Sequence, residues 1–271
     1  MEFVDTHCHI QSAGNSAGER TTGEIWAKAP ELTGVVVAER AADAGVAKLI
    51  CVGCDFVDSK LAISFAADHP NAWVSIGVHP HEAKDFAGNS QLKQEFADLV
   101  TNPKVIAVGE CGLDFYYNHS PKADQEAVLR YQIELALANN LPLIFHVRDA
   151  FDDFWPIFDD YNGIRGVVHS FTDSTANMER AVEKGLYIGV NGITTFAKQP
   201  SQIDMYRTIP LENLVLETDA PFLTPTPYRG SINEPKHIVT VASFLAELRG
   251  ESIANIAAST TTNAHTLFGL K

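Results

Sequence analysis

The chain has 271 residues, of which 45% are hydrophobic, and this length suits one (β/α)₈ barrel of typical size. Its formal net charge of −14 and the lack of any Lys/Arg cluster argue against tight, salt-dependent binding of duplex nucleic acid. No apolar run reaches transmembrane length and the N-terminus lacks the basic-then-apolar order of a signal peptide, so we expect a cytoplasmic protein without membrane contact.

Short β-branched runs alternate with helical patterns along the chain, which is typical of βα units and a parallel sheet. The expected strands are residues 3–9, 48–53, 73–78, 105–110, 143–147, 166–170, 186–190 and 214–219. The clearest helical patterns cover residues 124–139 and 238–248. Eight such units predict a closed (β/α)₈ TIM barrel that forms one domain over residues 1–271. An open doubly wound sheet is the weaker alternative, because no G-x-G-x-x-G or P-loop follows any strand.

Residues 11–33 interrupt this alternation. They are rich in Gly, Ala, Ser and Thr and show little periodicity. Because they directly follow the first strand, a barrel would place them as a long loop over the catalytic mouth. A disordered insertion is the alternative that the sequence leaves open.

The first expected strand ends in His7-Cys8-His9. Residues two apart on a strand point to the same face, so the two imidazoles point one way and Cys8 the other. Two imidazoles on one face suit a divalent metal ion. A pair of hydrogen-bonded loop histidines is the structural alternative.

Other expected strands also end in polar or metal-ligating side chains. These are His79 and His81 after the third strand, Glu110 in the fourth, His146 and Arg148 in the fifth, His169 in the sixth, and Glu217 and Asp219 in the eighth. The carboxyl ends of barrel strands meet at one face, so these distant residues are expected to converge.

Four histidines and two carboxylates exceed the needs of one tetrahedral site. A carboxylate can bridge two metal ions that lie roughly 3.5–4 Å apart. Imidazole and carboxylate without thiolate suit Zn, Mn, Fe or Ni and leave Mg or Ca for a weaker position. The donor set therefore predicts two divalent metal ions.

Together these motifs resemble the TatD family of metal-dependent hydrolases. The resemblance rests on His7-x-His9 and on residues 77–81, 109–114, 142–150, 169–171, 216–223 and 229–235, in family order. It implies a distorted barrel of the amidohydrolase type and a two-metal phosphodiesterase, typically a deoxyribonuclease of 3′→5′ exonuclease type. The implied substrates are DNA ends or short oligonucleotides.

The same resemblance implies a role for each ligand. His7, His9 and Asp219 are expected to hold the first metal ion. Glu110 is expected to bridge the two ions, and His146 and His169 to hold the second. Asp219 would also orient a metal-activated water and act as general base, which makes Asp219 and Glu110 the catalytic residues.

The sequence allows two roles for several side chains near the expected site. His79 either contacts the substrate phosphate or an activated water, or locks the turn at Pro80. His81 is expected to be structural. Tyr116 and Tyr117 either stack on a base or pack within their loop.

Arg148 shares the strand face of His146, so it either binds a substrate phosphate oxygen or pairs with Asp149 or Asp152. Asp5 is expected either to orient a ligand histidine or to serve as a turn residue at the strand start. Glu217 is expected to be a buried carboxylate behind the ligands, and Asn233 to cap the last long helix.

Two other functions remain as alternatives. The first is an amide, ester or lactone hydrolase that uses the same metal chemistry. The second is a barrel that keeps its metal ions but only binds a partner, which the complete ligand set disfavours. The physiological metal, the strand polarity and the oligomeric state are not determined by the sequence.

Overall fold

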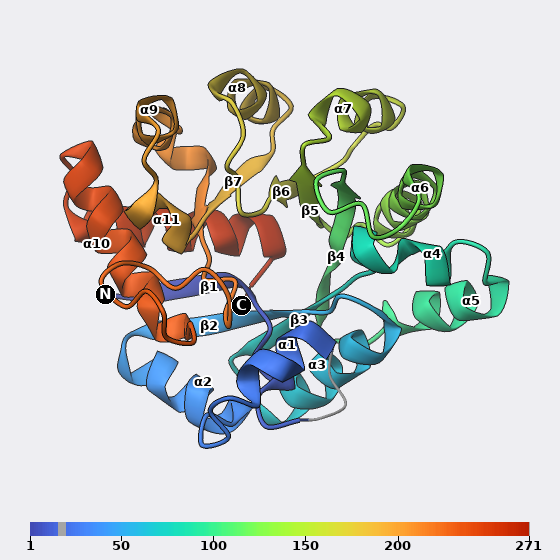
Figure 1. Cartoon of the computed structure of the whole chain (residues 1–271), viewed down its shortest axis with the longest axis horizontal. Coiled ribbons are helices and arrows are strands. Elements are labelled where there is room, and N and C mark those ends of the chain that lie inside the picture. The colour runs from blue at the N-terminus through green and yellow to red at the C-terminus, as the bar shows by residue number, and fades with distance from the viewer. Residues whose placement is uncertain (16–19, 271) are drawn as a thin grey trace.

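The computed structural model describes residues 1–15 and 20–270. Eight parallel strands pair in chain order, and an isolated bridge from Cys8 to Ala220 joins the two edges of the sheet. The predicted TIM barrel is confirmed, since the sheet is nearly closed and the helices surround it (Figure 1). The strands are β1 Phe3–Cys8, β2 Val46–Val52, β3 Ala72–Ile76, β4 Val105–Asp114, β5 Leu143–Arg148, β6 Gly166–Val168, β7 Tyr187–Val190 and β8 Leu214–Leu216.

The helices connect these strands and follow local sequence signals. They are α1 Arg20–Trp26, α2 Gly34–Asp43, α3 Phe56–Asp68, α4 Ala83–Phe86, α5 Ser90–Leu99, α6 Lys122–Ala138, α7 Phe151–Asp159, α8 Thr175–Glu183, α9 Pro200–Thr208, α10 Ile238–Arg249 and α11 Ile253–Phe268. Short 3₁₀ turns are η1 Ile10–Ser12, η2 Pro80–Glu82, η3 Gly192–Phe196, η4 Leu211–Asn213 and η5 Pro235–His237. Side-chain caps begin several helices, such as Thr33 before α2 and Ser252 before α11. The two helices predicted from periodicity are confirmed as α6 and α10.

All eight expected strands are present, but β4 is longer than expected. It continues past Glu110 to Asp114, and its last part pairs with β5, with Gly112 beside His146 and Asp114 beside Arg148. Two glycines in this run weaken its strand propensity, so the expected strand ended too early. The extension carries Asp114 to the mouth of the barrel.

The barrel has two layers of apolar packing. A smaller cluster joins buried residues of six strands to the end of α11, including Val4, Ile50, Val215 and Phe268. Side chains from so many strands can meet only in the barrel interior, and α11 contributes to this cluster. The larger cluster packs the opposite strand faces against the surrounding helices. Among the described residues, no helix combines the length and apolar character needed to cross a membrane.

The segment after β1 differs from the expected long loop. Within its described part, η1 is buried and α1 is a helix. Trp26 is 1% exposed and donates its indole N–H to the His9 carbonyl at 3.1 Å, which anchors α1 near the end of β1. Residues 16–19 of the predicted loop lie outside the described residues.

The expected cap at Asn233 is wrong. Glu234 occupies the N-cap position of η5, which precedes α10. The Asn233 amide instead donates to the carbonyls of Thr218 (2.8 Å) and Phe222 (2.6 Å). Asn233 therefore holds the loop that follows β8.

A glycine contact controls how closely β3 and β4 approach. A Cβ added to Gly77 would lie 2.2 Å from the Glu110 nitrogen and from the Gly109 carbonyl carbon. We expect Gly77→Ala to lower the free energy of unfolding by about 1–3 kcal/mol, because backbone must move to admit the methyl group. Thermal unfolding checks this, with Gly88→Ala as the matched control, since a Cβ there meets nothing within 4 Å. Equal stability of the two variants would contradict the prediction.

Candidate metal centre

Glu110 lies between two pairs of imidazoles, and each of its carboxylate oxygens faces one pair. Oε2 lies 3.3 Å from His7 Nε2 and 4.0 Å from His9 Nε2. Oε1 lies 2.7 Å from His146 Nδ1 and 2.9 Å from His169 Nε2. This arrangement suits a carboxylate that bridges two cations.

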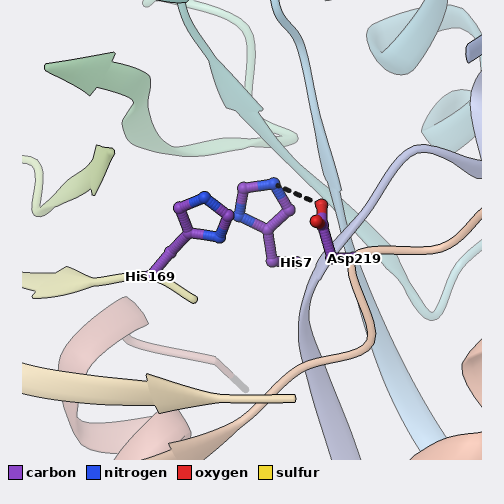
Figure 2. Close-up of side chains that lie close together, drawn as sticks. All are labelled: His7, His169 and Asp219. Carbon is purple, nitrogen blue, oxygen red and sulfur yellow. Dashed lines mark ion pairs between the residues drawn. The ribbon is translucent and has the colours of Figure 1, made fainter. Parts of the chain in front are cut away.

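Asp219 completes the group around the first pair. Its Oδ1 lies 3.6 Å from His7 Nε2 and 3.3 Å from His9 Nε2, and these two ring nitrogens lie 3.1 Å apart. Nitrogens bound to one tetrahedral ion at about 2.0–2.1 Å lie about 3.3 Å from each other, so the spacing suits one shared ion. Figure 2 shows Asp219 beside His7, while the His169 ring stacks on His7 with centroids 4.0 Å apart.

Backbone hydrogen bonds bring His7 and Asp219 together across the barrel closure. The Asp219 amide donates to the His7 carbonyl at 2.8 Å. The Asp5 carboxylate accepts hydrogen bonds from the amides of His7 (3.2 Å) and Thr218 (2.9 Å), and burial raises the pKa of Asp5 to about 8. Asp5 therefore positions the backbone on both sides of the closure and does not orient an imidazole directly.

Two of the four histidines have a hydrogen-bond acceptor at the ring nitrogen that faces away from the centre. The pairs are His9 Nδ1 with the Val52 carbonyl (2.8 Å) and His146 Nε2 with Asp114 Oδ2 (3.2 Å). A proton held at the outer nitrogen leaves the inner nitrogen as an acceptor, which is the form that binds a metal ion. The other two rings, His7 and His169, each have a buried Nδ1 without a hydrogen-bond partner among the described residues, although Glu217 Oε1 lies 3.3 Å from His169 Nδ1.

The carboxylates and imidazoles of the centre stabilise one another's charged forms, and their pKa values shift accordingly. Burial opposes ionisation of Glu110 and Asp219, but nearby imidazoles hold the pKa of both carboxyls below the usual range. Burial also opposes the charging of His146 and His169, yet neighbouring carboxylates raise the pKa of both rings. A metal ion that binds here would displace these protons, because imidazole binds a metal ion in its neutral form.

His79 has a different character from the other histidines. Its Nδ1 accepts the backbone N–H of His81 at 3.1 Å, so the neutral ring carries its proton on Nε2. That nitrogen lies 3.4 Å from Glu110 Oε1, and burial lowers the pKa of His79 to about 4. His79 therefore both locks the Pro80 turn and presents an N–H donor to the centre.

Asp114 links the centre to the loop after β4. Oδ2 lies 3.0 Å from His81 Nε2 and 3.2 Å from His146 Nε2. Oδ1 accepts the backbone N–H groups of Tyr116 (3.1 Å) and Tyr117 (2.9 Å). Burial opposes the charge, but the two imidazoles hold the pKa of Asp114 well below its usual range.

Two buried carboxylates near the candidate ligands, Asp114 and Asp58, have no role predicted from the sequence, although Asp114 belongs to the motif at residues 109–114. Asp114 lies on the same strand face as Glu110 and Gly112, so a longer expected β4 would have revealed it. Asp58 accepts a hydrogen bond from Gln11 Nε2 at 3.0 Å and supports the region behind the first histidine pair. No periodic signal marks Asp58, because its side-chain partners Gln11 and Ser12 lie more than 40 residues away in the sequence.

A cleft of about 810 Å³ opens over the centre. Its lining includes His9, Glu110, His146, His169 and Asp219, together with Thr21 and Thr22 of α1. At the rim, the Arg148 guanidinium carbon lies 4.2 Å from the Tyr116 ring centroid and 4.8 Å from that of Tyr117. The alternative ion pair of Arg148 with Asp149 or Asp152 is not formed among the described residues.

Comparison with known proteins assigns the chain to a family. The model of the TatD related DNase family matches residues 4–269. The chain belongs to this family. It is 35% identical over 241 residues to the 3′-5′ ssDNA/RNA exonuclease TatD of Shigella flexneri, with 86% of this chain and 92% of the relative covered.

Other TatD relatives support the same assignment. The metal-dependent hydrolase YabD of Bacillus subtilis is 36% identical over 239 residues, which cover 86% of this chain and 91% of YabD. The crystal structure of the TatD homologue YJJV of Escherichia coli superimposes with a TM-score of 0.85 at 29% identity, covering 99% of this chain and 98% of YJJV. This TatD family chain is therefore a hydrolase, and its clustered donors fit divalent metal ions.

The contacts of Asp114 generate a prediction about metal affinity. Asp114→Asn removes the charge beside His146 and should weaken binding of the ion that His146 would hold about 10–100-fold, as loss of such supporting carboxylates typically does. Calorimetric titration with Mn²⁺ measures this, with the exposed Asp153→Asn as control. Unchanged Mn²⁺ binding by Asp114→Asn would show that Asp114 does not support the centre.

Proposed function

We propose that this TatD family chain is a two-metal phosphodiesterase that removes nucleotides from the ends of single-stranded DNA or short oligonucleotides, in the manner of a 3′→5′ exonuclease. The observation that carries the proposal is the position of Glu110, with one carboxylate oxygen toward each pair of histidines. The substrate class is supported by relatives named 3′-5′ ssDNA/RNA exonuclease, whose sequence similarity covers most of this chain.

The proposed ligands divide between two positions. His7, His9 and Asp219 would hold the first ion, His146 and His169 would hold the second, and Glu110 would offer one carboxylate oxygen to each. When bound, two such ions polarise the phosphate, activate water and stabilise the attacking and leaving oxygens. The donor set suits Zn, Mn, Fe or Ni, and a weaker position accepts Mg or Ca.

Asp219 is the proposed general base. Its carboxyl is deprotonated at neutral pH because the nearby imidazoles, His9 foremost, outweigh the effect of burial and keep its pKa low. It lines the cleft, so its carboxylate can orient the attacking water and accept its proton as the new P–O bond forms. The P–O bond to the leaving sugar oxygen breaks in the same displacement, and that oxygen leaves as a hydroxyl group after it takes up a proton. Glu110 is the second proposed catalytic residue, because its carboxylate lies between the His7/His9 pair and the His146/His169 pair and sets their spacing.

His79 and Arg148 are the proposed phosphate-binding residues. The Nε2–H of His79 is a neutral donor beside Glu110, which suits a hydrogen bond to a non-bridging phosphate oxygen. Arg148 is exposed in the same cleft without a carboxylate partner in the described chain, so its guanidinium is available to a phosphate.

The acidic charge refines the proposed substrate. A protein with a net charge of −14 lacks the basic surface that binds long duplexes tightly, so contacts must concentrate at the metal centre and its rim. The proposed substrate is therefore a strand end and not a duplex. The single domain over residues 1–271 and the cytoplasmic location remain predictions.

The proposal predicts metal-dependent cleavage of single-stranded DNA. The Mn²⁺-loaded protein should shorten an end-labelled oligonucleotide, and excess EDTA should abolish this activity. Glu110→Gln should reduce kcat/KM at least about 100-fold, because a bridging ligand matters more than the supporting groups whose loss costs 10–100-fold. The exposed Glu39→Gln serves as the control of matched chemistry.

The same assay distinguishes the alternative hydrolase. Ester, lactone and amide substrates are tested beside the oligonucleotide with the same metal-loaded preparation. Turnover of a lactone or ester without any cleavage of DNA or RNA would contradict the proposed phosphodiesterase.

A further inference from the structure

Two tyrosines present their rings to the cleft next to the centre. Tyr116 is 58% exposed and Tyr117 is 51% exposed, and both line the cleft. Other large aromatic side chains of the barrel, such as Trp26 and Phe145, are almost fully buried. The exposed rings therefore contribute little to the core and face the space that a substrate would enter.

The backbone that carries these rings is fixed. Asp114 Oδ1 accepts the N–H groups of both Tyr116 and Tyr117, so one carboxylate holds two successive residues. The two rings pack edge to face, with centroids 4.8 Å apart and planes at 89°. Because the two rings are perpendicular, a flat ligand can stack on one of them and contact the edge of the other. The backbone beneath both rings is already held in place, which lowers the entropy lost on binding.

Arg148 extends this surface and relates it to the ligands. Strands β4 and β5 lie side by side (Figure 1). In their ladder, the backbone of Asp114 lies opposite that of Arg148, and Gly112 lies opposite His146. Arg148 is two residues beyond His146, about 6.6 Å farther along β5 toward the cleft opening. Its guanidinium lies over both tyrosine rings. The surface formed by Tyr116, Tyr117 and Arg148 thus begins two residues beyond His146, just outside the proposed metal ligands.

We propose that Tyr116, Tyr117 and Arg148 form a stacking site for the unpaired base nearest the phosphate that is cleaved. Every base has a π face that stacks on tyrosine rings and guanidinium planes, whatever its sequence. Stacking also requires no basic groove, which this chain of net charge −14 lacks. Bases within a duplex are covered by their neighbours, so this site selects single-stranded ends. The inference rests on the proposed phosphodiesterase function.

The test measures how strongly cleavage depends on that base. End-labelled single strands of identical length carry a normal base, or an abasic residue at the terminal or the penultimate position. For the Mn²⁺-loaded wild-type protein, kcat/KM should fall about 10-fold or more with at least one abasic strand, which is within the range of losses for one stacked base. In the double variant Tyr116→Ala/Tyr117→Ala, the ratio of kcat/KM for the normal strand to kcat/KM for the abasic strand should fall close to one.

Two further variants separate stacking from a loss of folding. Tyr116→Phe/Tyr117→Phe keeps the rings and should keep the wild-type ratio. Tyr228→Ala removes a similarly exposed tyrosine (47%) outside this cleft, and it should also keep the ratio.

The outcomes are distinct. A wild-type ratio near one, or a high ratio that survives the double alanine change, would overturn the stacking site alone. Absence of cleavage of every strand by the metal-loaded wild-type protein would overturn the proposed function and the stacking site with it.

Discussion

Glu110 keeps its two carboxylate oxygens apart, one toward His7 and His9 and the other toward His146 and His169. Burial of this carboxyl is tolerated because the imidazoles around it hold its pKa well below the usual range. The charge must remain matched, since an uncompensated buried carboxylate is strongly destabilising. The arrangement of the surrounding strands can therefore be understood as the means of holding four imidazoles around one carboxylate.

The barrel meets this requirement with contacts that are distant in sequence. Asp5 in β1 holds the amide of Thr218 after β8, which fixes the place where the sheet closes. Asp114 is hydrogen-bonded to His146 Nε2 and so fixes which nitrogen of that ring faces inward, and Glu217 lies 3.3 Å from His169 Nδ1. His9 and His146 are thus oriented by partners from neighbouring strands, Val52 in β2 and Asp114 in β4, and the sheet brings these partners together.

The sequence predicted the convergence of ligands because strand periodicity and parallel topology are local and general rules. His7 and His9 are two apart on one strand, so their common direction follows from the pleat alone. Asp114 was missed because Gly109 and Gly112 obscured the continuation of β4, and pairing with β5 maintains that continuation.

Other features depend on contacts that no local pattern encodes. The helical character of α1 was missed because its anchor is a hydrogen bond from Trp26 to the His9 carbonyl. Asn233 lies where a helix cap is expected, yet its amide binds the carbonyls of Thr218 and Phe222 instead. In both cases tertiary hydrogen bonds override the local sequence signal.

Glu110 is proposed to join two metal ions into one centre, and electron paramagnetic resonance of the Mn²⁺-loaded protein tests this role. Two ions bridged by a carboxylate at roughly 3.5–4 Å should give the spectrum of an exchange-coupled pair, with two Mn²⁺ bound per chain. Glu110→Gln should lose this coupled signal. A single bound Mn²⁺ per chain in the wild-type protein would contradict a two-metal centre. Two bound Mn²⁺ ions that give only uncoupled spectra would contradict a bridge through Glu110.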